Sequence, residues 1–193
     1  MHFDENTLRL AASGKKIAIV GNARSLLESS QGTAIDACDI VVRLNAAPGC
    51  QPASHGSKTT WLACSIPVPV ARLRQLRPEL ILYMTPKHRW RTVHLKLLGW
   101  KLAYYPKPWW QELRSKLDGA RPSTGIMAVD LMCRTGSFAE LKLFGFDFFQ
   151  SGSLSGRSAT APRSHDFQKE GEVMASLAAT DDRITIVTPL PPR

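Results

Sequence analysis

The sequence has no apolar run long enough to cross a bilayer. Its longest runs, such as residues 17–20 and 80–84, fall far below the roughly 20 residues that a spanning helix needs. The first residues also lack the cationic start and apolar core of a secretory signal. We therefore expect a cytoplasmic protein.

Cysteine is scarce, and two common sequence fingerprints are missing. The four cysteines form no CxxC pair, which argues against a zinc knuckle or a dithiol redox motif and for idle thiols in a reducing compartment. No GxGxxG is present, so the dinucleotide-binding fingerprint is absent. These absences leave a soluble domain whose chemistry must come from other residue types.

The composition is that of one globular domain. The chain has 193 residues, 44% of them apolar and 21% charged, so we expect a single domain over residues 1–193, with residues 1–14 as a peripheral segment. The net charge of +9 favours an anionic partner, and nucleic acid, an acidic membrane and a phosphorylated sugar all qualify. No run of five cations occurs, so a solvated surface accounts for most of this charge.

Short β-rich runs alternate with helical ones along the chain. Strands are expected at residues 17–20, 39–44, 59–63, 80–84, 102–105, 141–146 and 184–187, with helices at 25–30, from 123 or 124 to 132, and at 165–179. This pattern predicts an α/β fold: a Rossmann-like, mostly parallel sheet with helices on both faces. Ligands bind such sheets beyond the carboxyl ends of the strands. We therefore expect the loops after Val20, Leu44 and Tyr105 and the helix start at Ser123 to lie together at that edge of the sheet.

Two strand ends carry polar residues. Gly21 and Asn22 follow the first strand and lead into a helix, where backbone N–H groups can face an anion, although a plain strand-to-helix turn looks the same. Arg43 and Asn45 share one side of the next strand by two-residue periodicity. Such residues are more often structural than catalytic.

Two later segments offer hydroxyls and a titratable base. Ser123, Thr124 and Gly125 can cap a helix and admit a ligand, and an ordinary helix cap is the simpler interpretation. His165 can take a proton near neutral pH, and Glu170 on the same expected helix can orient it.

Together and in this order, the four segments resemble the sialyl motifs of the sialyltransferase family (glycosyltransferase family 29). The long motif is similar to residues 17–60, with VGN, RLNAAP and GSKTT; the short motif is similar to residues 122–146, with PSTG and LKLFGF. The very short motif, a His followed five residues later by Glu, matches His165 and Glu170. The resemblance covers residues 16–172, with a weak middle at 73–120, and implies the compact variant of the GT-A fold in a bacterial relative.

The resemblance implies an inverting transfer of a sialic-acid-type sugar from a CMP-sugar donor to a glycan hydroxyl. His165 would be the general base, with Glu170 beside it. The donor would be held by a set of small and polar residues: Gly21, Asn22, Arg43, Asn45, Ser123, Thr124 and Gly125. No cofactor and no metal are implied, and no DxD occurs, since amides, cations and a helix end can hold the single phosphate of CMP.

The sequence departs from the family pattern in two places. The interval 148–164 holds no His, so the phosphate-assisting His of the family is missing or replaced by Arg157 or Arg163. Ile17 stands where the first Cys of the family's disulfide is expected. The segment 152–163, rich in Gly, Ser and Ala, is either a linker or a mobile lid.

Three alternatives remain open at this stage. The chain could be a CMP-Kdo-dependent transferase of lipopolysaccharide or capsule synthesis, since Kdo shares the 2-keto acid and carboxylate of the sialic acids, or it could bind CMP without transferring a sugar. The hypothesis of a nucleic-acid-binding module is supported only by the net charge and by tryptophans among Lys and Arg residues, and we expect no nucleic-acid partner. Trp109 and Trp110 suit either a core-packing helix or a segment at the inner membrane that meets a lipid-linked glycan acceptor.

Overall fold

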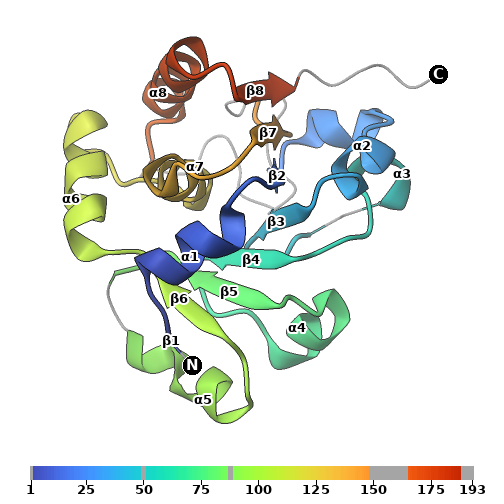
Figure 1. Cartoon of the computed structure of the whole chain (residues 1–193), viewed down its shortest axis with the longest axis vertical. Helices are drawn as coiled ribbons and strands as arrows, with labels where there is room; N and C mark the ends of the chain where they lie inside the picture. The colour runs from blue at the N-terminus through green and yellow to red at the C-terminus, as the bar shows by residue number, and fades with distance from the viewer. Residues whose placement is uncertain (1, 49–50, 87–88, 148–164, 188–193) are drawn as a thin grey trace.

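The short apolar runs form one eight-stranded sheet in this computed structural model, which describes residues 2–48, 51–86, 89–147 and 165–187. The strand order is β1-β6-β5-β4-β3-β2-β7-β8, and every pairing is parallel (Figure 1). The strands are β1 (His2–Phe3), β2 (Lys16–Val20), β3 (Ile40–Leu44), β4 (Trp61–Cys64), β5 (Leu80–Tyr83), β6 (Leu102–Tyr104), β7 (Glu140–Phe144) and β8 (Ile184–Val187). The expected Rossmann-like parallel α/β sheet is confirmed.

Helices cover both faces of this sheet. One face carries α1 (Glu5–Ala12), α6 (Lys107–Lys116), α7 (Thr124–Thr135) and α8 (Phe167–Thr180). The other side carries α2 (Gly32–Asp36), α3 (Pro52–His55), α4 (Val70–Leu76) and α5 (Val93–Leu97), with the 3-10 helices η1 (Arg24–Glu28) and η2 (Arg89–Thr92). Successive side chains of β2 point to opposite faces of the sheet. Ile17 and Ile19 belong to the main core cluster, on the face that α7 covers, whereas Ala18 and Val20 belong to a cluster on the other face.

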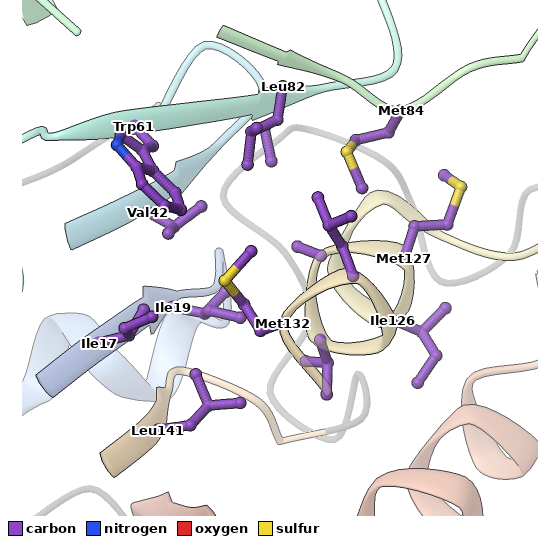
Figure 2. Packing of buried hydrophobic residues seen from close by; sticks show 14 of the residues in the cluster. Ile17, Ile19, Val42, Trp61, Leu82, Met84, Ile126, Met127, Met132 and Leu141 are labelled. Atoms are coloured by element: carbon purple, nitrogen blue, oxygen red, sulfur yellow. The ribbon is translucent and has the colours of Figure 1, made fainter. Parts of the chain in front are cut away.

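Helix α7 is the best-buried helix and lies over the centre of the sheet. Its Met127 lies toward Met84 and its Met132 toward Ile19, in a cluster that includes apolar side chains of β2, β3, β4, β5 and β7 (Figure 2). Full burial of each such side chain contributes about 1.5–3 kcal/mol. This packing fixes the amino end of α7 at the carboxyl edge of the sheet.

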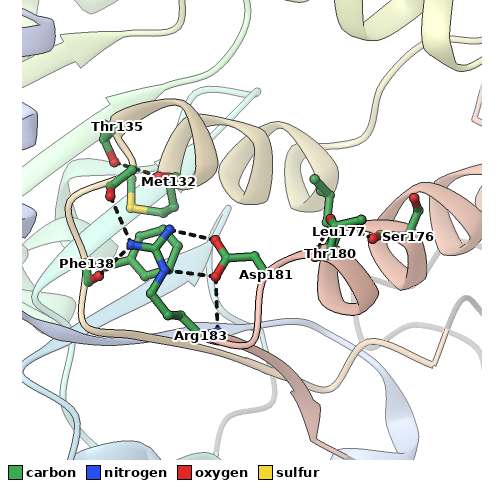
Figure 3. A network of polar contacts seen from close by, with 9 residues as sticks. Met132, Thr135, Phe138, Ser176, Leu177, Thr180, Asp181 and Arg183 are labelled. Atoms are coloured by element: carbon green, nitrogen blue, oxygen red, sulfur yellow. Dashed lines mark hydrogen bonds and ion pairs between the residues drawn. The ribbon is translucent and has the colours of Figure 1, made fainter.

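An arginine fork ties the end of α8 to the end of α7. The Arg183 guanidinium donates to both carboxylate oxygens of Asp181 at 2.7 and 2.8 Å and to the Gly136 carbonyl at 3.1 Å (Figure 3). It also lies over the Phe138 ring, 4.6 Å from the centroid. These contacts hold the α8–β8 turn against the α7–β7 turn.

The first 14 residues are less peripheral than we expected. Helix α1 buries Leu8 and Ala12 in the main core, and Asp4 caps the helix by accepting from Thr7 N at 2.9 Å. The two-residue strand β1 precedes this helix and pairs with β6.

Two expected helices differ at their starts. Residues 24–28 form a 3-10 helix instead of the expected α-helix over 25–30. Helix α8 begins at Phe167 because the Asp166 carboxylate accepts from Lys169 N at 3.0 Å and caps it there. His165 therefore precedes the helix instead of lying within it. Within the described residues, no helix is both long and apolar enough to span a membrane.

Candidate functional site

Hydroxyl and amide groups from three strand ends meet the amino end of α7. The Thr124 hydroxyl donates to Ser65 Oγ at 2.7 Å, and Asn45 Nδ2 lies 3.4 Å from Thr124 Oγ1. Asn45 Oδ1 accepts from Ser65 N at 3.2 Å, and the Thr85 hydroxyl donates to the Ser65 carbonyl at 2.7 Å. Asn45, Ser65 and Thr85 follow β3, β4 and β5, so the cluster stands at the predicted carboxyl edge of the sheet.

The backbone at Asn45 explains why this position carries an amide. Its φ is +54°, in the left-handed region that Asn tolerates better than most residues. Its backbone N–H donates to the Ala63 carbonyl at 2.8 Å and closes the strand pair. The chain turns sharply here, and the side chain faces Thr124 instead of continuing the strand.

Glu170 holds the first residue of the α7 cap. The Ser123 N–H donates to Oε1 of Glu170 at 2.7 Å, and the Ser123 hydroxyl donates to Oε2 at 2.6 Å. Glu170 is buried, and that burial raises its pKa to about 7, against the lowering effect of the two Ser123 hydrogen bonds. We expected Glu170 to orient His165; its two carboxylate oxygens instead engage Ser123.

The backbone of Arg121, two residues before Ser123, contacts His165. His165 Nδ1 lies 2.6 Å from the Arg121 carbonyl, which can only accept, so Nδ1 carries the proton. Neutral His165 then has its lone pair on Nε2. Segment 121–125 therefore contacts both predicted catalytic residues and, through Thr124, the Asn45 cluster.

Two of the predicted glycines stand where chains approach closely. A Cβ at Gly21 would lie 2.2 Å from the Gly145 carbonyl oxygen, and one at Gly125 would lie 3.0 Å from the Phe146 ring. Asn22, beside Gly21, is half-buried. The absence of a side chain at Gly21 thus allows the end of β7 to approach closely, and Asn22 places an amide at the same edge of the sheet.

Arg43 departs from the expected site. The residue is 2% exposed, and its guanidinium donates to backbone carbonyls of His55 (3.0 Å) and Lys58 (2.9 Å) and to the Thr59 hydroxyl (3.0 Å). These contacts bind the 55–59 loop to β3. Arg43 and Asn45 do not share a side, because the left-handed turn at Asn45 ends the two-residue alternation.

Ser65 and Thr85 were missed in the sequence. A single hydroxyl directly after each of two buried strands was the available signal, since such positions share the ligand-binding edge. Arg157, Arg163 and the 152–163 segment lie outside the described residues. Among the residues that are described, no group of three or more His, Cys, Asp or Glu could hold a metal ion.

Comparison with protein families gives one match. Residues 9–75 match the family model of glycosyltransferase family 29 (sialyltransferase). That range includes Gly21, Asn22 and Asn45 and ends before Ser123 and His165. The resemblance stated from the sequence is thereby confirmed over this part of the chain. A search of curated protein sequences found no match.

Solved sialyltransferase structures share the fold. A mammalian sialyltransferase in complex with Gal-beta-1-3GalNAc-ortho-nitrophenol is 23% identical, with a TM-score of 0.70 over 97% of this chain and 74% of that one. The sialyltransferase CstII from Campylobacter jejuni, with the substrate analogue CMP-3FNeuAc, is 16% identical, with a TM-score of 0.56 over 89% and 78%. The same enzyme with a trisaccharide acceptor and CMP gives 16% identity and 0.60 over 92% and 82%.

Proposed function

We propose, from the match of residues 9–75 to the sialyltransferase family, that this chain transfers a sialic-acid-type sugar from a CMP-sugar to a glycan hydroxyl. The observation that carries the proposal is the convergence on segment 121–125. His165 contacts its backbone, Glu170 contacts Ser123, and the Asn45 cluster contacts Thr124. The segments that resemble the family motifs are thus adjacent in space.

The donor phosphate would lie at the amino end of α7. A helix start carries unpaired N–H groups and a partial positive charge, and Asn22 and Asn45 supply amides nearby. One phosphate needs no divalent cation when amides and a helix end hold it. The Campylobacter enzyme was solved with CMP and with CMP-3FNeuAc, which supports a CMP-sugar as the donor here.

The reaction needs one base. His165 Nε2 takes the proton of the acceptor hydroxyl while its oxygen bonds to the anomeric carbon of the sugar. The bond from that carbon to the CMP phosphate oxygen breaks on the opposite side, so the anomeric configuration inverts and CMP leaves with the electron pair. The Arg121 carbonyl stabilises the resulting imidazolium through Nδ1–H.

The finer parts of the function are also proposals. The acceptor is a glycan, which a lipid can carry, and the enzyme works in the cytoplasm at the inner membrane. CMP-Kdo remains the alternative donor because it presents the same carboxylate. A protein that binds CMP without transfer would combine an intact phosphate site with a base that no acceptor reaches.

Binding of CMP tests the donor assignment directly. CMP at 100 times its dissociation constant should raise the free energy of unfolding by about 2.7 kcal/mol, equally with and without a chelator. Asn45→Asp keeps a residue that tolerates the left-handed backbone but places a negative charge against the phosphate, so the thermal shift should vanish.

The matched control is Asn6→Asp, which makes the same change at an exposed position of α1. This variant should shift with CMP as the natural sequence does. Failure of CMP to stabilise the natural protein at millimolar concentration, or a requirement for a divalent cation, would refute the donor assignment.

A further inference from the structure

Large apolar side chains are exposed on one surface, residues 90–98. Trp90 is 69% exposed, Leu97 83% and Leu98 54%, and Val93 is half-exposed as well. Ile66, also half-exposed, lines a shallow pocket together with Arg91, His94 and Leu95, and so borders the same surface. Exposed apolar groups gathered in this way mark an interaction site more often than scattered ones do.

The fold holds this surface in place from beneath. Leu95 is 6% exposed and packs with Ile81, Tyr83 and Leu102 in the core cluster below α5. The neighbouring residues of the short helix therefore point away from the sheet. Leu97 is therefore exposed even though its helix, α5, packs against the core through Leu95.

The charge around the surface has one sign. The chain has no Asp or Glu between Glu79 and Glu112, and six Lys or Arg residues fall in that interval. Arg91, Lys96 and His94 are exposed within the surface itself, and Arg91 lies 5.5 Å from the Trp90 ring centroid. A cationic rim around exposed Trp and Leu is typical of a surface that meets anionic lipids.

Trp109 and Trp110 do not form such a surface. Both pack against the main core from α6, and Trp109 meets Tyr105 edge-on at 6.2 Å and the Arg134 guanidinium at 5.0 Å. The core-packing interpretation of this pair therefore fits the structure, and the exposed apolar area belongs to η2 and α5 instead.

Residues 90–98 lie within the connection from the carboxyl end of β5 to the amino end of β6. Trp90 comes five residues after Thr85, whose hydroxyl donates to the Ser65 carbonyl in the proposed donor site. Leu97 and Leu98 come shortly before Leu102, where β6 begins.

We propose that residues 90–98 bind the surface of an anionic membrane. Trp90, Leu97 and Leu98 enter the boundary between head groups and acyl chains, and Arg91 and Lys96 face the anionic head groups. The exposed Leu and Val side chains favour lipid over nucleic acid, because aliphatic groups have no aromatic face on which a base could stack. The proposal needs no catalytic activity and stands apart from the donor assignment.

Vesicle co-sedimentation of the full chain, without CMP, tests the proposal. The protein should bind vesicles of phosphatidylglycerol and phosphatidylcholine in equal parts far better than vesicles of phosphatidylcholine alone. The double variant Trp90→Ser, Leu97→Ser should lower the partition coefficient about tenfold or more, because both side chains lose their insertion. Arg91→Gln and Lys96→Gln should each lower it about fivefold, and less at high salt.

Two changes elsewhere serve as matched controls. Leu10→Ser removes an apolar side chain that is 76% exposed on α1, and Lys15→Gln removes an exposed cation. Both variants should bind vesicles as the natural sequence does. Equal binding to neutral and anionic vesicles, or loss of binding in the controls to the same degree, would overturn the proposal. So would a single-stranded oligonucleotide that binds through Trp90 and Arg91 while vesicles do not.

Discussion

Glu170 places a buried carboxylate against the helix start that the donor is proposed to use. Both its oxygens accept from Ser123, and the partial positive charge at the amino end of α7 favours an anion there. Burial nonetheless raises its pKa to about 7, so the group changes charge near neutrality. Glu170 is thus a positioning residue: it fixes Ser123 and, with it, the backbone that contacts His165.

This raised pKa makes folding stability depend on pH. The unfolded chain releases the proton near the ordinary value of 4.5 and the folded chain near 7, so in this window the folded state binds more protons. The free energy of unfolding therefore falls as pH rises from 4.5 to 7, by about 3 kcal/mol from this group. Glu170→Gln keeps an acceptor for Ser123 N–H and should remove that fall.

Urea unfolding at a series of pH values across the window measures the effect. The difference in unfolding free energy between Glu170→Gln and the natural sequence should grow with pH. Glu172→Gln, at an exposed position of the same helix, should leave the pH dependence unchanged. Parallel curves for Glu170→Gln and the natural sequence would show that the carboxyl titrates alike in both states.

At the scale of elements, the strands and the edge that they share were predictable, because buried runs and the helix cap at Ser123 are local signals. The structure brings Asn45, Thr124, His165 and Glu170 to segment 121–125, and their roles in binding and transfer stay predictions. The prediction that Arg43 and Asn45 lie on the same side of the strand was wrong, because the two-residue alternation gives no signal of the left-handed turn at Asn45. The contact between half-buried Ser123 and buried Glu170 joins residues 47 positions apart and gives no local signal in the sequence.

The junction of β2 and β7 offers a test at this scale. Gly21 N–H donates to the Phe144 carbonyl at 2.7 Å, and an added Cβ would lie 2.2 Å from the Gly145 carbonyl oxygen. Gly21→Ala should therefore part the two strand ends and lower the free energy of unfolding by about 3 kcal/mol or more. Denaturant unfolding measures the loss.

Gly14→Ala is the comparison variant. Its Cβ would meet nothing within 4 Å, and its cost of about 1–2 kcal/mol comes only from a φ of +66°. A Gly21→Ala protein of normal stability that has lost only its affinity for CMP would instead assign Gly21 to the ligand.

At the scale of the whole molecule, a parallel sheet brings residues from four distant segments to one edge. The net charge of +9 favours both of the proposed partners, since the CMP-sugar donor and an anionic membrane carry the opposite sign. The three thiols that the structure describes, Cys38, Cys64 and Cys133, are free, and burial raises the pKa of Cys64 to about 12, which leaves it unreactive. The base in the proposed transfer is His165.

Turnover of a CMP-sugar by the natural protein and by His165→Ala tests this account most directly. In the presence of chelator and a soluble glycan acceptor, the natural protein should release CMP from CMP-sialic acid faster than from CMP-Kdo. His165→Ala should lose about 10²–10⁴-fold in rate with CMP affinity nearly unchanged, because the base faces the acceptor. His94→Ala, outside the site, should retain full turnover. Absence of CMP release from either donor, or near-normal turnover by folded His165→Ala, would contradict the account.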